Sequence, residues 1–132
     1  MKLDGPGRWT RGNRRWLPAV CWTVVLVGGS LVTPPGQGTT PLGPFGLVGL
    51  DKYAHAFGYA VLGGFVSLAV RPRSWRGVVL AVALTAGVGA GVEVAQAFVP
   101  ARSTALADGV ANTVGAALGL AVWWVLTASL DR

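Results

Sequence analysis

Residues 93–108, EVAQAFVPARSTALAD, connect two of the most apolar stretches of this chain and contain three ionisable side chains and one amide side chain. These side chains are Glu93, Gln96, Arg102 and Asp108. The three residues PAR in the middle are typical of a short turn. The stretch therefore predicts two helices joined by a tight turn, with polar side chains gathered at the end where the helices meet.

The composition is that of a membrane protein. Of the 132 residues, 52% are hydrophobic and 12% are charged, and the mean hydropathy is +0.55. Soluble domains carry about 25% charged residues. The single cysteine, Cys21, lies inside an apolar run, which excludes a disulfide framework and a cysteine-based metal site.

The apolar runs predict four membrane-spanning helices, each long enough to cross roughly 30 Å of hydrocarbon. They cover residues 16–33, 51–70, 77–99 and 104–128. We therefore expect an all-α, integral membrane four-helix bundle that lies in the cell membrane as a multi-pass protein. Residues 1–15 form a basic N-terminal tail, residues 16–128 form the transmembrane domain, and the uncharged segment 34–50, which holds four of the eight prolines, forms a loop.

The distribution of basic residues predicts the orientation of the bundle. Lys and Arg in short flanking segments are retained in the cytoplasm. Placing both termini in the cytoplasm leaves nine of the eleven Lys and Arg residues on that side, and only Lys52 and Arg102 outside. The net charge of +6 thus reflects topology, and no nucleic-acid partner is expected.

A basic tail followed by an apolar run is also the pattern of a cleaved signal peptide. The run at 16–33 exceeds the usual hydrophobic region of such a peptide, and no clear A-x-A cleavage site follows it. Cleavage would leave the orientation of the other three spans unchanged.

The polar residues of the last three spans fall in one layer, at the predicted extracytoplasmic ends of the helices. Residues three or four apart on a helix share a face. Three such faces result: Asp51, His55 and Tyr59 with Lys52 beside them; Glu93 and Gln96; and Asp108 and Asn112, with Arg102 in the turn.

Small residues continue these faces toward the opposite side of the membrane. Ala86 and Gly89 follow Glu93, and Gly115 and Gly119 follow Asn112. Small side chains let membrane helices approach closely, so these faces should point into the bundle. Gly87 and Gly91 have the same spacing but give a weaker indication, since glycine is common in membrane helices.

Charged side chains in a membrane cost on the order of 3 kcal/mol and tend to be paired and functional. We expect the layer to form a charge-compensated pocket open to the extracytoplasmic side. The alternative is that these side chains reach water from the span ends, or simply hold the helices together.

Two motifs resemble the VanZ-like family. DKYAHAFGYAVL (51–62) is similar to its D-K-x-x-H-x-x-x-Y-x-x-L signature, and residues 93–119 are similar to E-x-x-Q-x-F-x-P-x-R-x5-D-x-x-x-N-x-x-G-x-x-x-G. The resemblance implies a small integral membrane protein, and the family's namesake is associated with resistance to glycopeptide antibiotics such as teicoplanin. It defines no reaction.

Two functions are open at this point. The layer can bind an envelope lipid, a lipid-linked cell-wall intermediate or a glycopeptide-type antibiotic, with Arg102 and Lys52 pairing with phosphate or carboxylate. The expected ligand-binding residues are Asp51, Lys52, His55, Tyr59, Glu93, Gln96, Arg102, Asp108 and Asn112.

The alternative is a membrane-embedded hydrolase or transferase that acts on an envelope lipid, with His55, Glu93 and Asp108 as catalytic groups. No G-x-S-x-G or H-E-x-x-H template is present, so the sequence does not decide whether the protein is an enzyme. No cofactor is expected. A divalent cation among Asp51, His55, Glu93 and Asp108 is disfavoured because these residues lack a diagnostic spacing. The bilayer is the one certain partner, and the oligomeric state is left open.

Overall fold

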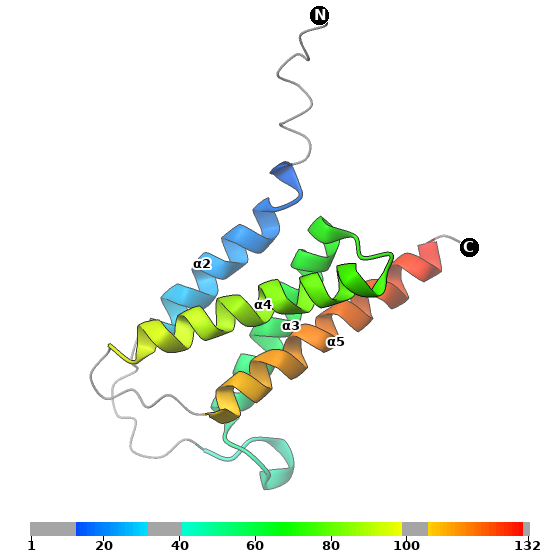
Figure 1. The fold of residues 1–132 in the computed structure, drawn as a ribbon. Helices are drawn as coiled ribbons and strands as arrows, with labels where there is room; N and C mark the ends of the chain where they lie inside the picture. Colours follow the sequence, from blue (N-terminus) through cyan, green and yellow to red (C-terminus); the bar gives the residue numbers. More distant parts are fainter. Residues whose placement is uncertain (1–12, 32–40, 99–105, 131–132) are drawn as a thin grey trace, which may run out of the picture.

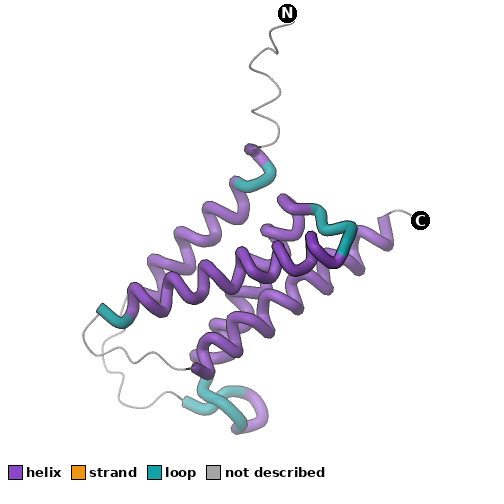
Figure 2. Tube along the Cα trace, viewed as in Figure 1, coloured by secondary structure: helices purple, strands orange, loops and turns teal. Residues whose placement is uncertain are grey.

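The computed structural model describes residues 13–31, 41–98 and 106–130, and this part of the chain is largely α-helical (Figure 1, Figure 2). In order, its elements are α2 (Leu17–Leu31), the 3-10 turn η1 (Pro44–Gly46), α3 (Leu50–Val70), α4 (Trp75–Gln96) and α5 (Leu106–Leu130). Within the described ranges, the one β-type pairing is an isolated bridge between Leu42 and Gly49. The predicted all-α fold of four helices is confirmed.

Three of the helices have the length and composition of membrane spans. They are α3, α4 and α5, with 21, 22 and 25 residues. The described part of α2 is also apolar but has 15 residues, fewer than the roughly 20 needed to cross the hydrocarbon core. Each described helix end lies within three residues of the predicted one. The predicted boundaries at residues 33, 99 and 104 lie outside the described residues.

Large apolar side chains cover the outward faces of the helices, as lipid-facing surfaces require. Val24 on α2, Val94 on α4 and Val125 on α5 are 67%, 62% and 66% exposed, respectively. The interior of the bundle is small and partly polar, since helices surrounded by lipid have no need to bury their apolar side chains. It is therefore the polar and small residues that distinguish the inside of this bundle from its outside.

Helix α3 is the centre of the bundle and packs against α2, α4 and α5 (Figure 1). Its approach to α5 is close because glycines face backbone on both sides. A Cβ atom at Gly63 would lie 2.7 Å from the carbonyl oxygen of Ala116. At Gly115 and Gly119 it would overlap the carbonyl oxygens of Ala56 and Ala60, so only glycine fits at these two positions.

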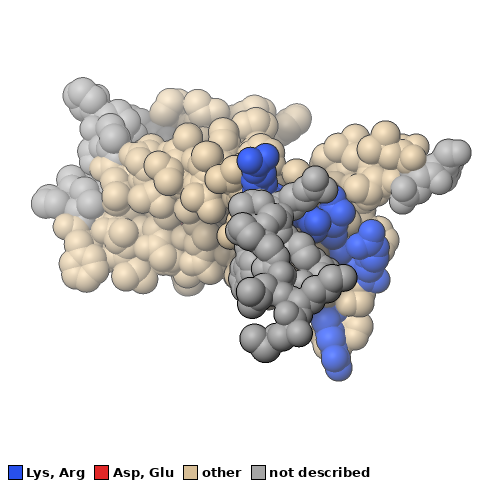
Figure 3. All heavy atoms as spheres, turned by 90° about the horizontal axis from the view of Figure 1, so that it is seen from above, with Lys and Arg blue, Asp and Glu red and all other residues tan. Residues whose placement is uncertain are grey.

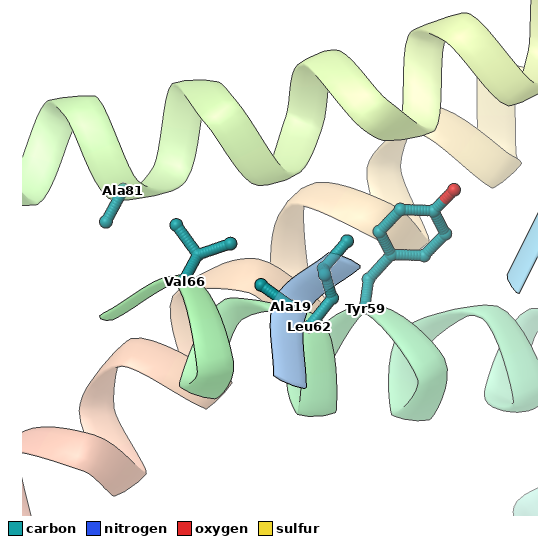
Figure 4. Close-up of a cluster of buried hydrophobic side chains, with 5 residues drawn as sticks. All are labelled: Ala19, Tyr59, Leu62, Val66 and Ala81. Carbon is teal, nitrogen blue, oxygen red and sulfur yellow. The ribbon is translucent and has the colours of Figure 1, made fainter. Parts of the chain in front are cut away.

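A small apolar cluster joins α2, α3 and α4 near the middle of the bundle (Figure 4). Its buried members are Ala19, Tyr59, Leu62, Val66 and Ala81. The indole Nε1 of Trp22 donates a 2.8 Å hydrogen bond to the carbonyl oxygen of Gly58 and so fixes α2 against α3.

The described part of the 34–50 loop folds back on itself before α3 begins. The N–H of Gly43 donates to the carbonyl oxygen of Val48 at 2.8 Å. The hydroxyl of Tyr53 donates to the carbonyl oxygen of Pro44 at 2.6 Å. These bonds hold the loop against the first turns of α3. The loop therefore lies at the same end of the bundle as the start of α3.

A tight basic turn connects α3 to α4 at the opposite end. Arg71 adopts a left-handed conformation (φ 52°), and its N–H donates to the carbonyl oxygen of Ser67 at 2.7 Å, which caps α3. Pro72 prevents α3 from continuing, and Ser74 caps the start of α4. Seen from the end at which α2 begins, basic side chains gather on the surface and no acidic side chain is visible (Figure 3).

Candidate functional site

The described polar residues predicted for the site lie where α3 begins, α4 ends and α5 begins, three helix termini that share one end of the bundle (Figure 1). We call them the polar cluster: Asp51, Lys52, His55, Tyr59, Glu93, Gln96, Asp108 and Asn112. Arg102 and Pro100 lie outside the described residues. The cluster occupies the end opposite the basic turn between α3 and α4.

Lys52 lies between two carboxylates from different helices. Its Nζ contacts Oδ2 of Asp51 at 2.6 Å and also forms an ion pair with Oδ1 of Asp108 on α5. The side chains of Lys52 and Asp108 are 21% and 10% exposed, whereas that of Asp51 is 37% exposed. The pair with Asp108 is thus the better shielded of the two, and it links the first turns of α3 and α5.

Glu93 and Asn112 link α4 to α5. Nδ2 of Asn112 donates to Oε1 of Glu93 at 3.2 Å, and Asn112 is 2% exposed. Gly89 leaves the space that Asn112 and Tyr59 occupy, since a Cβ atom there would lie 2.9 Å from Nδ2 of Asn112 and 3.3 Å from Cε1 of Tyr59. The predicted small face below Glu93 therefore makes room for the polar side chains of the neighbouring helices.

His55 and Tyr59 stack one turn apart on α3, with ring centroids 6.4 Å apart and planes 6° from parallel. Tyr59 is 1% exposed, and its hydroxyl has no hydrogen-bond partner among the described residues. The hydroxyl points away from the other labelled side chains of the apolar cluster (Figure 4). Asp51 contacts Lys52, and no described hydrogen bond orients His55.

Gln96 connects α4 to α2 instead of to its predicted neighbours. Its Nε2 donates to the carbonyl oxygen of Ser30 at 3.1 Å, and the side chain is 3% exposed. This bond satisfies a backbone carbonyl near the described end of α2. Gln96 therefore contributes to helix packing.

Two grooves border the polar cluster on different sides. The larger, about 490 Å³, lies between α4 and α5, which diverge toward this end of the bundle (Figure 1). Its lining includes Ala86, Ala90, Glu93, Leu106, Val110, Asn112 and Val114. The smaller, about 230 Å³, lies between α2 and α3, and its polar lining residues are Ser30, Asp51 and His55.

The structure therefore divides the predicted pocket. Glu93 and Asn112 face one groove, and Asp51 and His55 face another. Lys52 and Asp108 line neither of these two grooves. Within the described ranges, no group of three or more His, Cys, Asp and Glu side chains is arranged to hold a metal ion.

Sequence reasoning missed several residues that shape the larger groove. Gly109 and Thr113 line it together with Leu106 and Val110. Helical spacing could have identified these residues, because Gly109 lies one turn before Asn112 and Thr113 lies one turn after Gly109. The prediction followed the buried face of α5 that carries Asp108 and Asn112. The groove extends along the neighbouring face of the same helix.

The fold and the placement of the polar cluster define a multi-pass α-helical membrane protein. Comparison with family models gives a match to the VanZ/LLP1 family over residues 14–127, so the chain belongs to that family. The match agrees with both sequence motifs, and it extends across α2 and the 34–50 loop, where no motif was recognised. Searches of curated proteins and of solved structures found no match.

Proposed function

We propose that this VanZ-family protein binds an amphiphile of the cell envelope in the groove between α4 and α5. The candidate ligands are an envelope lipid, a lipid-linked cell-wall intermediate and a glycopeptide-type antibiotic. The observation that carries the proposal is the groove itself, because Glu93 and Asn112 lie beside apolar walls in a space of about 490 Å³. Small-molecule sites have this size and this combination of lining residues.

The walls of the groove suit a hydrocarbon chain. Val110 and Val114 are 63% and 49% exposed, so the groove is open toward the lipid that surrounds the bundle. A ligand can therefore enter from the side, within the membrane. Small residues on α4, Ala86 and Ala90, form the facing wall.

Glu93 suits a headgroup that donates hydrogen bonds. Its carboxylate is an acceptor, and the described contact from Asn112 uses only one of its two oxygens. Amino and hydroxyl groups, which sugars and peptides carry, are donors to such an acceptor. Lys52 is less suited to bind an anion than the sequence suggested, because two carboxylates already contact it. Arg102 remains the proposed partner of a phosphate or carboxylate.

The orientation of the site remains part of the proposal. The positive-inside rule places the polar cluster on the extracytoplasmic side, where envelope precursors and antibiotics are encountered. It also makes residues 1–15 a cytoplasmic tail. The hydrolase or transferase alternative needs His55 and Glu93 to act on one substrate, and it has less support because they border different grooves.

The test is Glu93→Gln, which keeps the shape and most hydrogen bonding of the side chain but removes its charge. We expect normal membrane abundance and thermal stability, together with loss of whatever envelope phenotype the gene deletion produces. Thr85→Val is the matched control, because it is a near-isosteric change of a buried side chain on the same helix, outside the groove. A Glu93→Gln variant that folds and fully restores the phenotype would contradict the proposal.

A further inference from the structure

A third groove, which we call the basic groove, lies at the opposite end of the bundle, between the α3–α4 turn and the last turns of α5. Its volume is about 470 Å³. The lining residues that matter here are Leu68, Arg71, Arg73, Trp123, Trp124 and Thr127. None of them belongs to the polar cluster, so what this groove binds is independent of the function proposed above.

Among the residues that the structure describes, the groove presents positive charge without a neighbouring acid. Arg71 and Arg73 are both exposed, and neither forms an ion pair within the described part of the chain. All three described acids, Asp51, Glu93 and Asp108, belong to the polar cluster at the other end. The view in Figure 3 shows basic side chains and no acidic ones. The groove is thus lined by two guanidinium groups, each able to donate hydrogen bonds to an anion.

The turn that carries these arginines is well defined. The left-handed backbone of Arg71 is held by its hydrogen bond to Ser67. Pro72, between the two arginines, is buried and packs against Gly77, where a Cβ atom would lie 3.0 Å from Cα of the proline. Because these contacts hold the backbone at both ends of the turn, a ligand can bind without the entropic cost of ordering it.

The groove continues into an apolar one. Leu68 and Trp123 line both the basic groove and a groove of about 490 Å³ that follows α3 and α5 toward the middle of the membrane. This apolar groove is lined almost wholly by apolar residues, among them Phe57, Val61, Gly64, Leu118 and Val122. A basic site at a helix end that opens into an apolar channel matches the two parts of a phospholipid.

We propose that this region binds an anionic phospholipid, with its phosphate at Arg71 and Arg73 and an acyl chain in the groove between α3 and α5. Arginine pairs well with phosphate because its planar fork can donate two hydrogen bonds. Trp124, which is 51% exposed, has the position of an interfacial aromatic residue beside the headgroup. Basic pockets between membrane helices bind such headgroups in general.

The test measures how much phosphatidylglycerol the full-length protein retains from mixed micelles that also contain phosphatidylcholine, by native mass spectrometry. We expect the wild-type protein to prefer phosphatidylglycerol. Arg71→Gln with Arg73→Gln should reduce that preference about 25-fold, since each arginine near an anionic headgroup contributes roughly fivefold. Arg76→Gln is the matched control, because Arg76 lies over the ring of Trp75 and does not line the groove. It should change retention much less than the double variant does.

A second pair of variants separates a lipid site from a site for free phosphate. Gly64→Leu should weaken phosphatidylglycerol retention, because the added side chain fills the apolar groove, while a Cβ atom at Gly64 makes only an ordinary contact with Gly119. Gly91→Leu, which faces open space, should have no effect. Millimolar inorganic phosphate should not displace the lipid.

Two results would overturn the proposal. Equal retention by the wild-type protein and the Arg71→Gln, Arg73→Gln variant would show that no headgroup site exists. Displacement by inorganic phosphate, with no effect of Gly64→Leu, would show a site for a free anion only. The variant Arg71→Lys with Arg73→Lys keeps the charge and should retain part of the preference, which guards against a loss caused by misfolding.

Discussion

At the scale of single residues, Lys52 links α3 to α5 at the polar end of the bundle. It is the one described cation there, and it contacts Asp51 on its own helix and Asp108 on α5. Lys52→Met should destabilise the protein by on the order of 3 kcal/mol, because removing one partner leaves a shielded carboxylate uncompensated. Thermal unfolding in detergent measures the effect.

The matched variant is Lys52→Met combined with Asp108→Asn. Removing both charges should recover much of the lost stability, because no uncompensated charge then remains between α3 and α5. If the double variant is no more stable than Lys52→Met alone, the ion pair is not what links these helices.

The sequence predicted which residues share a helix face but not their partners on other helices. Spacing placed Asp51 with His55 and Asp108 with Asn112, and the structure keeps each pair on one helix. Whether Lys52 pairs with Asp108, and Gln96 with Ser30, depends on how the helices rotate and cross. Those angles follow from packing across the whole bundle, which spacing along one helix does not contain.

At the scale of helices, the contact between α3 and α5 depends on glycine. Gly119→Leu should prevent normal folding, with a loss above about 4 kcal/mol, because a side chain there overlaps the backbone of Ala60 and approaches the backbone nitrogen of Gly64 to 2.7 Å. The measurement is the yield of monodisperse protein after extraction from membranes.

Gly87→Leu is the control for this prediction. It adds the same apolar side chain to a membrane helix, but nothing lies within 4 Å of a Cβ atom at Gly87. Its yield should equal that of the wild-type protein. Similar losses from both substitutions would mean that the close approach of α3 and α5 is not what glycine provides.

The pair of glycines at 87 and 91 illustrates what spacing cannot decide. Both positions face open space in this chain, whereas Gly115 and Gly119, with the same separation, face α3. The second pair was the stronger prediction because it continues the helix face of Asp108 and Asn112. Helix boundaries were more predictable, since turns with proline such as Arg71–Pro72–Arg73 end a helix by local rules.

At the scale of the whole molecule, the basic residues predict the orientation in the membrane. Single cysteines at Leu47 and Ser74, in a background with Cys21 replaced by serine, lie at opposite ends of the bundle. An impermeant thiol reagent added to intact cells should label position 47 and not position 74. The reverse labelling pattern would show that the orientation is the opposite one, with the polar cluster on the cytoplasmic side.

The central claim is that the groove between α4 and α5 binds an envelope amphiphile. The most direct measurement is photocrosslinking in growing cells, with a benzoylphenylalanine at position 110 in the groove and a control at position 79, a lipid-exposed valine on α4 that lines none of the grooves described. Mass spectrometry identifies the adducts. We predict an amphiphile enriched at position 110 over position 79, and loss of this enrichment in Glu93→Gln. The same bulk phospholipids at both positions, unchanged by Glu93→Gln, would contradict the account.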